Sequence, residues 1–165
     1  MLEKQVVRAR YGFTLADMAI AMLIIGILAA VAAPKFVDSI VWFRAEAAVK
    51  RVAADLNFAR HEAKSSGKSR SVDFVVATNS YTLSGIADLN RASQLYSVNL
   101  ADTGYPATLV SVDFDGNGSV TFDRYGHPYA GSPLAALTSG SIVVESGNVQ
   151  GTVVVNPTTG EASVP

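Results

Sequence analysis

The chain has 165 residues, and its 13 lysines and arginines are balanced by 14 aspartates and glutamates, so it has room for one domain and no second catalytic one. Its formal net charge of −1 excludes the global basic field on which indiscriminate nucleic-acid binders rely. The lack of cysteine excludes disulfides, thiolate metal sites and cysteine nucleophiles, and two histidines nearly exclude a histidine-built metal site.

The first element is an apolar segment at residues 13–33, which reads FTLADMAIAMLIIGILAAVAA and has Asp17 as its only ionisable residue. A bilayer core of ~30 Å needs ~20 apolar residues in a helix, so this segment is long enough to span. The residues before it carry more basic than acidic side chains. By the positive-inside rule, the N-terminus stays cytoplasmic and everything after Lys35 lies outside.

Three interpretations of this segment compete. A secretory signal peptide would be cut after the small residues 30–32 and would release a soluble protein that begins near Ala33. An uncleaved membrane anchor is the second. Against the signal peptide, the apolar run exceeds the usual ~7 to 15 residues, and export requires no acid such as Asp17 near its cytoplasmic end.

The third interpretation comes from residues 12–17, which read Gly-Phe-Thr-Leu-Ala-Asp, followed at a distance by Pro34. This pattern resembles the type IV prepilin signature. The resemblance implies that a prepilin peptidase cuts between Gly12 and Phe13 and methylates the new amino terminus of Phe13. It also implies a helix kink at Pro34. The family usually has glutamate where this chain has Asp17, which keeps the charge with a side chain one methylene shorter.

A carboxylate inside a bilayer costs ~2.5 to 3.5 kcal/mol on insertion scales, so Asp17 needs a partner. The prepilin resemblance implies one, namely the amino group of Phe13 on a neighbouring subunit, and such a pair would set the axial register of a filament. The alternative is that Asp17 lies at the headgroup boundary and is solvated.

After Pro34 the pattern becomes amphipathic and predicts that one helix continues to residue 66, with Gly67 as its stop signal. The apolar face recurs at steps of three and four residues: Val41, Ala45, Ala48, Val52, Leu56, Ala59 and Ala63. The other faces are predicted to be polar and include Glu46, Lys50, Arg51, Asp55, Arg60 and Glu62. Such a helix would be about 80 Å long at ~1.5 Å per residue.

The remaining residues, 67–165, are rich in strand formers separated by glycine, proline, asparagine and aspartate. We predict an α+β fold, a pilin-like lollipop in which the long helix packs against one antiparallel sheet. The predicted strands cover residues 71–78, 80–86, 94–98, 108–114, 119–123, 141–145, 152–156 and 162–164.

Three segments narrow the family, and they lie at residues 43–74, 119–128 and 153–164. They resemble the GspH/FimT class of minor pseudopilins, in the same order along the chain. Where this class would have an arginine after Gly160, the chain has Glu161, and Arg124 is its last basic residue. DNA-uptake members of the class are expected to use basic residues near the C-terminus, so we expect no nucleic-acid partner.

A possible metal site begins at Asp113. The run Asp113-Phe-Asp115-Gly-Asn117-Gly-Ser-Val matches the first eight positions of an EF-hand loop, but Arg124 stands where the bidentate glutamate belongs. One hypothesis is a weak Ca²⁺ site built from Asp113, Asp115, Asn117 and Asp123. The alternative, which we favour, is a β-turn in which Asn117-Gly118 supplies positive φ, with no metal or other cofactor.

The remaining candidates indicate no chemistry. His61 is interpreted as a solvated helix residue, and His127 lies in a glycine- and proline-rich loop. The basic cluster of Lys64, Lys68 and Arg70 is interpreted as a cap that compensates the helix dipole rather than as a phosphate site. No nucleophile elbow, P-loop or dinucleotide-binding fingerprint occurs in the sequence. We therefore expect that the protein is not an enzyme.

The resemblance implies four segments: a leader at 1–12, a transmembrane assembly helix at 13–34, an amphipathic helix at 35–66 and a periplasmic β-rich domain at 67–165. It implies a minor pseudopilin of a type II secretion pseudopilus, or alternatively a minor type IV pilin of a pilus-priming or DNA-uptake system. The expected location is the bacterial inner membrane, in a single pass. The expected partners are the prepilin peptidase, other major and minor pseudopilins and exported protein cargo.

Overall fold

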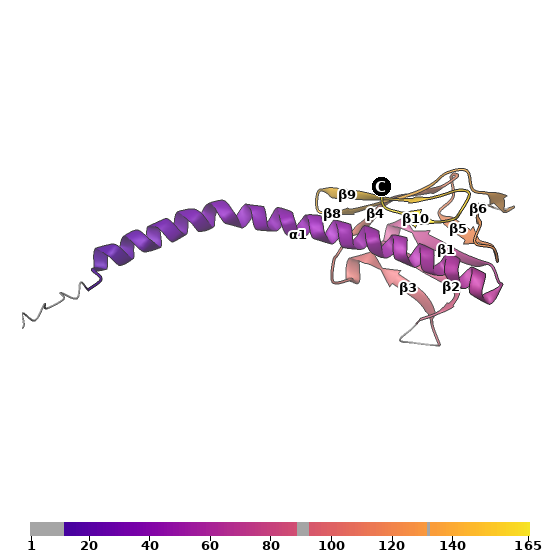
Figure 1. The fold of residues 1–165 in the computed structure, drawn as a ribbon, viewed down its shortest axis with the longest axis horizontal. Coiled ribbons are helices and arrows are strands. Elements are labelled where there is room, and N and C mark those ends of the chain that lie inside the picture. Colours follow the sequence, from indigo (N-terminus) through magenta and orange to yellow (C-terminus); the bar gives the residue numbers. More distant parts are fainter. Residues whose placement is uncertain (1–11, 89–92, 132) are drawn as a thin grey trace, which may run out of the picture. The chain divides into compact units, whose positions relative to one another are not determined.

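The structure is a computed structural model and describes residues 12–88, 93–131 and 133–165. The chain divides into two compact units, with the boundary inside the long helix between Asp38 and Ser39. The elements, labelled in Figure 1 where there is room, are α1 (Leu15–Ser66), β1 (Arg70–Val75), η1 (Val76–Thr78), β2 (Ser80–Ala87), β3 (Leu95–Asn99), η2 (Leu100–Asp102), β4 (Thr108–Phe114), β5 (Ser119–Phe122), β6 (Pro128–Ala130), β7 (Ala135–Ala136), β8 (Gly140–Ser146), β9 (Val149–Val155) and β10 (Ala162–Ser163).

Helix α1 confirms the prediction of one helix that crosses both the apolar and the amphipathic segments. It ends at Ser66, and Gly67 follows with φ of +65°, a conformation that stops a helix and that glycine adopts without a Cβ penalty. The helix runs through position 34, and the predicted kink at Pro34 stays a prediction.

The strands form two antiparallel sheets rather than the single sheet predicted from the sequence. One sheet has the order β3-β2-β1-β5-β6-β7, and the other has the order β10-β9-β8-β4. The chain passes from the second sheet to the first between β4 and β5, which are adjacent in sequence. Periodicity within a strand does not reveal which strand it will pair with, so the division into sheets was not visible in the pattern.

The predicted strands are close to those observed, and 108–114 coincides with β4. The pattern missed β6 and β7. The first begins with proline and the second has only two alanines, so neither carries the β-branched residues or the alternation that marks a strand. The end of the predicted strand at 71–78 is instead the short helix η1.

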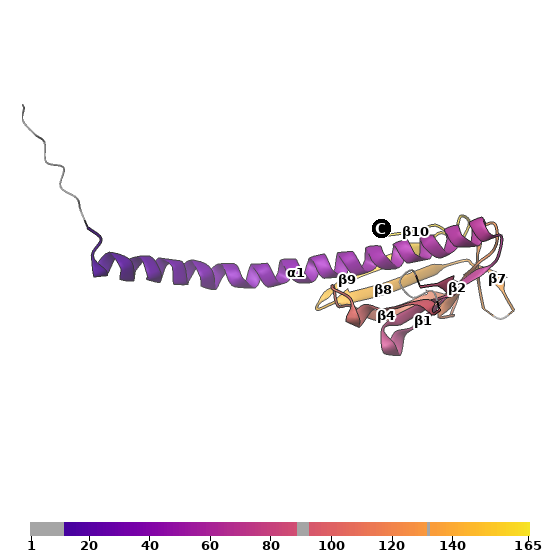
Figure 2. The same cartoon turned by 90° about the horizontal axis from the view of Figure 1, so that it is seen from below.

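Within the unit that begins at Ser39, α1 packs across one side of both sheets (Figure 2). Its buried face consists of Ala45, Ala48, Val49, Val52, Ala53, Leu56, Ala59 and Ala63, which confirms the predicted apolar face except at Val41, which is half-buried. The small residues let the backbones approach. A Cβ atom on Gly151 of β9 would lie 2.5 Å from Cγ2 of Val49, so this contact requires glycine.

Asp55 is the one clear error in the predicted helix faces, because it is 7% exposed and lies within the core. Its Oδ2 accepts hydrogen bonds from the Tyr81 hydroxyl at 2.6 Å and from Nε of Arg51 at 2.9 Å. Its Oδ1 accepts a bond from the Tyr96 hydroxyl at 3.1 Å, and Nη2 of Arg51 donates to the same hydroxyl. Buried charges need such partners, so this polar network ties α1 to β2 and β3.

The network predicts a loss of stability at alkaline pH. Burial, and then the negative charge of Asp55, raises the pKa of the Tyr81 hydroxyl far above its ordinary value, and the pKa of Tyr96 is raised for the same reasons. The unfolded chain therefore loses these protons first, near pH ~10. The stabilisation is complete below that pH and declines as the pH rises above it. Urea titrations between pH 8 and about 11 should show this decline, and Tyr81→Phe should make it shallower.

Candidate functional site

The start of α1 is organised by Thr14 and Asp17. The backbone N–H and the hydroxyl of Thr14 both donate to Oδ2 of Asp17, at 3.0 and 2.8 Å. In return, the backbone N–H of Asp17 donates to the Thr14 hydroxyl at 3.2 Å. This reciprocal arrangement is a capping box, which satisfies N–H groups that a helix start otherwise leaves unpaired. Thr-x-x-Asp before an apolar run is the sequence signal of this motif, and it was not among the predicted features.

The predicted cleavage junction lies just before this cap. Gly12 and Phe13 precede α1, and both are exposed, with Phe13 92% exposed. A peptidase needs an accessible backbone, which such a position offers. The capping contact is made within one chain, so the predicted pairing of Asp17 with the amino group of a neighbouring subunit stays a prediction.

The first unit of the structure contains a helix segment that is apolar enough to cross a membrane. An 18-residue window of α1 has a mean hydropathy of 2.5, and none of that window is buried. The large side chains on it are more than half exposed: Met18, Ile20, Met22, Leu23, Ile24, Ile25, Ile27, Leu28 and Val31. Such exposure is costly in water, so this surface fits a lipid or protein environment.

The carboxylate oxygens of the candidate Ca²⁺ site accept hydrogen bonds from different parts of the chain. Oδ1 of Asp113 accepts the N–H of Gly116, and the carboxylate of Asp115 accepts the hydroxyl and N–H of Thr138 and the N–H of Ser139. The Thr138 bonds hold the pKa of Asp115 below its ordinary value. Among the described residues, no group of three acidic or histidine side chains has the spacing of a metal site. The Ca²⁺ hypothesis stays a prediction, which calorimetry with Ca²⁺ would test.

A β-turn is present, as favoured, but it lies two residues earlier than predicted. Asn117 and Phe114 exchange backbone hydrogen bonds, and positive φ falls on Asp115 (+52°) and Gly116 (+82°) rather than on Asn117 and Gly118. Two-residue hairpin turns favour Asp-Gly at these two positions. The amide of Asn117 instead donates to the carbonyls of Phe114 and Asp115.

Asp123, the fourth candidate ligand, organises a separate turn between β5 and β6. Its Oδ1 accepts the backbone N–H groups of Tyr125 and His127, each at 2.8 Å. The guanidinium of Arg124 lies 4.9 Å from the centre of the Tyr125 ring. The other histidine, His61, is exposed on α1 as predicted.

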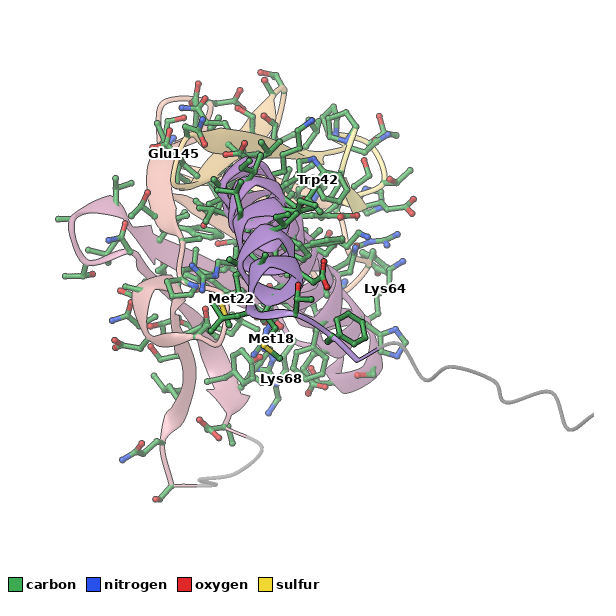
Figure 3. All side chains as sticks on the ribbon, turned by 90° about the vertical axis from the view of Figure 1, so that its left-hand side faces the viewer. Met18, Met22, Trp42, Lys64, Lys68 and Glu145 are labelled. Atoms are coloured by element: carbon green, nitrogen blue, oxygen red, sulfur yellow. The ribbon has the colours of Figure 1, made fainter. Side chains whose placement is uncertain are left out.

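The predicted basic cluster at the end of α1 does not act as one group. Arg70 is largely buried and lies 3.6 Å from Oε1 of Glu62, while Lys64 and Lys68 lie apart around the helix in the view of Figure 3. Lys64 is in the last turn of α1, where a cation stabilises the helix dipole. The capping interpretation therefore applies to Lys64, and Arg70 is a structural residue.

The amino-acid sequence was compared with known protein families. The family described as "Type II transport protein GspH" matches residues 48–159, which is more than half of the chain. The chain belongs to the GspH family. The matched region begins in the buried face of α1 and ends beside Gly160, so it contains both sheets except the two-residue β10. No curated protein sequence matches the chain significantly.

The fold of this GspH-family chain is similar to that of solved structures. The type IV minor pilin FimU of Pseudomonas aeruginosa PAO1 is 15% identical with a TM-score of 0.52, and the match covers 73% of this chain and 87% of FimU. The minor pseudopilin EpsH from the type 2 secretion system of Vibrio cholerae is 14% identical with a TM-score of 0.51, and the match covers 74% of this chain and 96% of EpsH. The predicted pilin-like α+β fold is thereby confirmed.

Membership of the GspH family also establishes the broad role. The family consists of structural subunits rather than enzymes, which confirms that no enzymatic activity is to be expected. The protein has a minor pseudopilin-like or pilin-like role in type II secretion or type IV pili, in association with other pseudopilins. The apolar helix and the family together are consistent with a membrane-anchored periplasmic subunit.

Proposed function

We propose that this GspH-family protein is a minor pseudopilin of the pseudopilus, or of its tip complex, in type II protein secretion. The observation that carries the proposal is the match of residues 48–159 to a family described by type II transport. The structural likenesses include both a minor pilin and a minor pseudopilin, so the choice of machine rests on the family. The absence of basic residues after Arg124 supports secretion over DNA uptake, because nucleic-acid binding needs cations on the surface.

In this proposal the protein acts as a structural subunit of an assembly. The prepilin peptidase removes residues 1–12 and methylates the amino group of Phe13. The apolar part of α1 stays in the inner membrane and then packs among partner helices, while the domain from Ser39 onward presents its surface to other pseudopilins or to exported cargo. The N-terminus before cleavage is cytoplasmic, and the β-rich domain is periplasmic.

Asp17 has two successive roles in this proposal. Before assembly its carboxylate caps its own helix through Thr14. During assembly Asp17 exchanges this contact for the amino group of Phe13 on a neighbouring subunit. The reason is that moving an ion pair out of water costs less free energy than moving an isolated carboxylate. The exchange needs the carboxylate to be ionised and within reach of the neighbour.

Processing is the first prediction of this function. Recovered from membranes of a host with its own prepilin peptidase, the protein should have an N-terminus at methylated Phe13 by intact mass and N-terminal sequencing. Substitution of Gly12 should leave the leader attached. A soluble product that begins near Ala33, or an unprocessed Met1 in the unsubstituted protein, would contradict the proposal.

The same preparation tests Asp17. Asp17→Ala should still be processed but should be lost from the sheared pseudopilus fraction, whereas Asp17→Glu should be retained. Thr14→Ala is the matched control, since it removes the hydroxyl of the cap but leaves the carboxylate. Equal loss of Thr14→Ala and Asp17→Ala from that fraction would mean that Asp17 acts only as a helix cap.

A further inference from the structure

The unit that begins at Ser39 carries an exposed aromatic group on the first turns of its helix. Trp42 is 51% exposed and Phe43 is 63% exposed, and their rings lie edge to face with centroids 5.2 Å apart. Ile40, which comes three residues before Phe43, is 47% exposed. Large apolar side chains that gather on a surface mark a contact with a membrane or with another molecule.

Ile40 and Phe43 lie on the face of α1 opposite the one that is buried against the sheets. Further along this outward face, Lys50 and His61 are exposed, as is usual for the water-facing side of an amphipathic helix. The outward face thus changes from apolar to polar after Phe43, ten residues beyond the end of the apolar segment 13–33. The surroundings that the apolar segment needs therefore extend to Phe43.

The length of α1 indicates what these surroundings are. Leu15 and Phe43 are 28 residues apart, which is ~42 Å of helix at ~1.5 Å per residue. A bilayer measures ~40–45 Å with its headgroups. A spanning helix that begins at Leu15 in one headgroup layer therefore reaches the opposite layer at Phe43. Asp38, at ~8 Å of helix before Phe43, then lies at the boundary between this layer and the hydrocarbon core.

The residue types from Lys35 to Arg44 are typical of a headgroup layer. Lys35, Asp38 and Arg44 are exposed, and they alternate with apolar and aromatic residues. Aromatic side chains are enriched at the membrane–water interface, and long cationic side chains extend to the headgroups from beside it. The core of a protein–protein interface is instead depleted of charged residues. This mixture favours lipid headgroups over the helix of a partner subunit.

Trp42 is at the same time part of the β-rich domain. It lines a hollow of about 260 Å³ together with Val49 of α1 and with Val149 and Gly151 of β9. About half of its surface is covered by the domain, and the rest is free for an outside contact. An anchor at Trp42 therefore positions the domain as well as the helix.

We propose that Trp42 and Phe43 hold the β-rich domain at the surface of the membrane, with both rings in the periplasmic headgroup layer. The occupant is lipid because the aromatic group continues, along the sequence, the membrane-crossing part of α1, whose 18-residue window has a mean hydropathy of 2.5. The contact fixes the height of the domain above the membrane before the subunit enters an assembly. The inference rests on the proposed function, which supplies the membrane span and the periplasmic location.

Fluorescence tests this contact directly, because Trp42 is the only tryptophan of the chain. The full-length protein, recovered from membranes of a host with its own prepilin peptidase, is reconstituted in vesicles of phosphatidylethanolamine and phosphatidylglycerol. Parallel vesicles contain lipid brominated either next to the headgroup or at the end of the acyl chain, since bromine quenches tryptophan only at short range. The matched control combines Trp42→Phe with Ala54→Trp, which moves the probe to an exposed position on the same helix.

We expect Trp42 to emit at a shorter wavelength than the probe at position 54. Bromine next to the headgroup should quench Trp42 more strongly than bromine at the chain end, and neither should quench the probe at position 54. Ile40→Ser combined with Phe43→Ser should reduce the quenching of Trp42, because the apolar area that enters the lipid is lost. Ala47→Ser, on the same face four residues after Phe43, should leave this quenching unchanged.

Equal quenching at positions 42 and 54 would overturn the anchor. Stronger quenching by bromine at the chain end would also overturn it, because Trp42 would then lie in the hydrocarbon core. A protein that does not float with the vesicles, or that keeps its N-terminus at Met1, would instead overturn the proposed function, so the two failures are distinguishable.

Discussion

Replacing Asp55 with alanine is expected to lower the free energy of unfolding by about 3 kcal/mol. The substitution leaves the hydroxyl of Tyr81, which is 1% exposed, without the carboxylate that it binds at 2.6 Å. It also removes the ionic partner of Arg51. A buried polar group without a partner keeps its desolvation cost and loses the compensating bond. Urea unfolding of the full chain in detergent micelles, followed by tryptophan fluorescence, measures the change.

The helix itself provides the control for Asp55. Glu46 and Lys50 form an ion pair four residues apart on α1, as do Arg51 and Asp55, but the first pair is largely solvated. Glu46→Ala should cost about 0.5 kcal/mol or less. If Asp55→Ala and Glu46→Ala cost the same, the network around Asp55 does not hold α1 on the sheets.

The second large effect is expected at Gly160, where alanine should destabilise the domain by about 3 kcal/mol. Gly160 has φ of +70°. This left-handed backbone conformation raises the free energy of a residue with a Cβ by ~1 to 2 kcal/mol. In addition, that Cβ would lie 2.3 Å from the carbonyl oxygen of Gly126. A backbone atom cannot move aside as a flexible side chain can, so overpacking adds ~1 to 3 kcal/mol.

Gly67→Ala separates these two contributions. Gly67 has a similar φ of +65°, but nothing lies within 4 Å of the position that its Cβ would take. It should therefore lose only about 1 kcal/mol through backbone strain. Both variants are measured by urea unfolding in detergent. A Gly160→Ala variant as stable as Gly67→Ala would mean that the turns at Gly126 and Gly160 are not in close contact.

The close approach at Gly160 also fixes the turn between β5 and β6. The turn that contains Arg124 is held from one side by Asp123, which binds two of its N–H groups, and from the other by Gly160. These contacts hold the turn in one conformation.

The N-terminal part of the candidate site could be predicted from local sequence. A membrane-crossing segment is recognised from length and hydropathy alone, and the junction of Gly12 with Phe13 and the acid at Asp17 are adjacent in the chain. The capping role of Asp17 is equally local, because its Thr-x-x-Asp signal spans only four residues. By contrast, the contacts of Asp115 with Thr138 and Ser139 join residues distant in sequence, which periodicity cannot bring together.

Several elements of the fold could be predicted from the amino-acid sequence alone. These are the apolar segment, the helix stop at Gly67, the strand at 108–114 and the amphipathic face of α1, because each depends on neighbouring residues and on backbone preference. Three other features depend on contacts in the folded protein: the strands form two sheets, Asp-Gly rather than Asn-Gly makes the turn after β4, and Asp55 is buried. From the sequence alone, an aspartate on a helix is expected to be solvated. In the folded protein, Tyr81 and Tyr96, which lie on strands far along the chain, donate hydrogen bonds to Asp55. Their hydroxyls offset its desolvation, and that balance exists only in the folded protein.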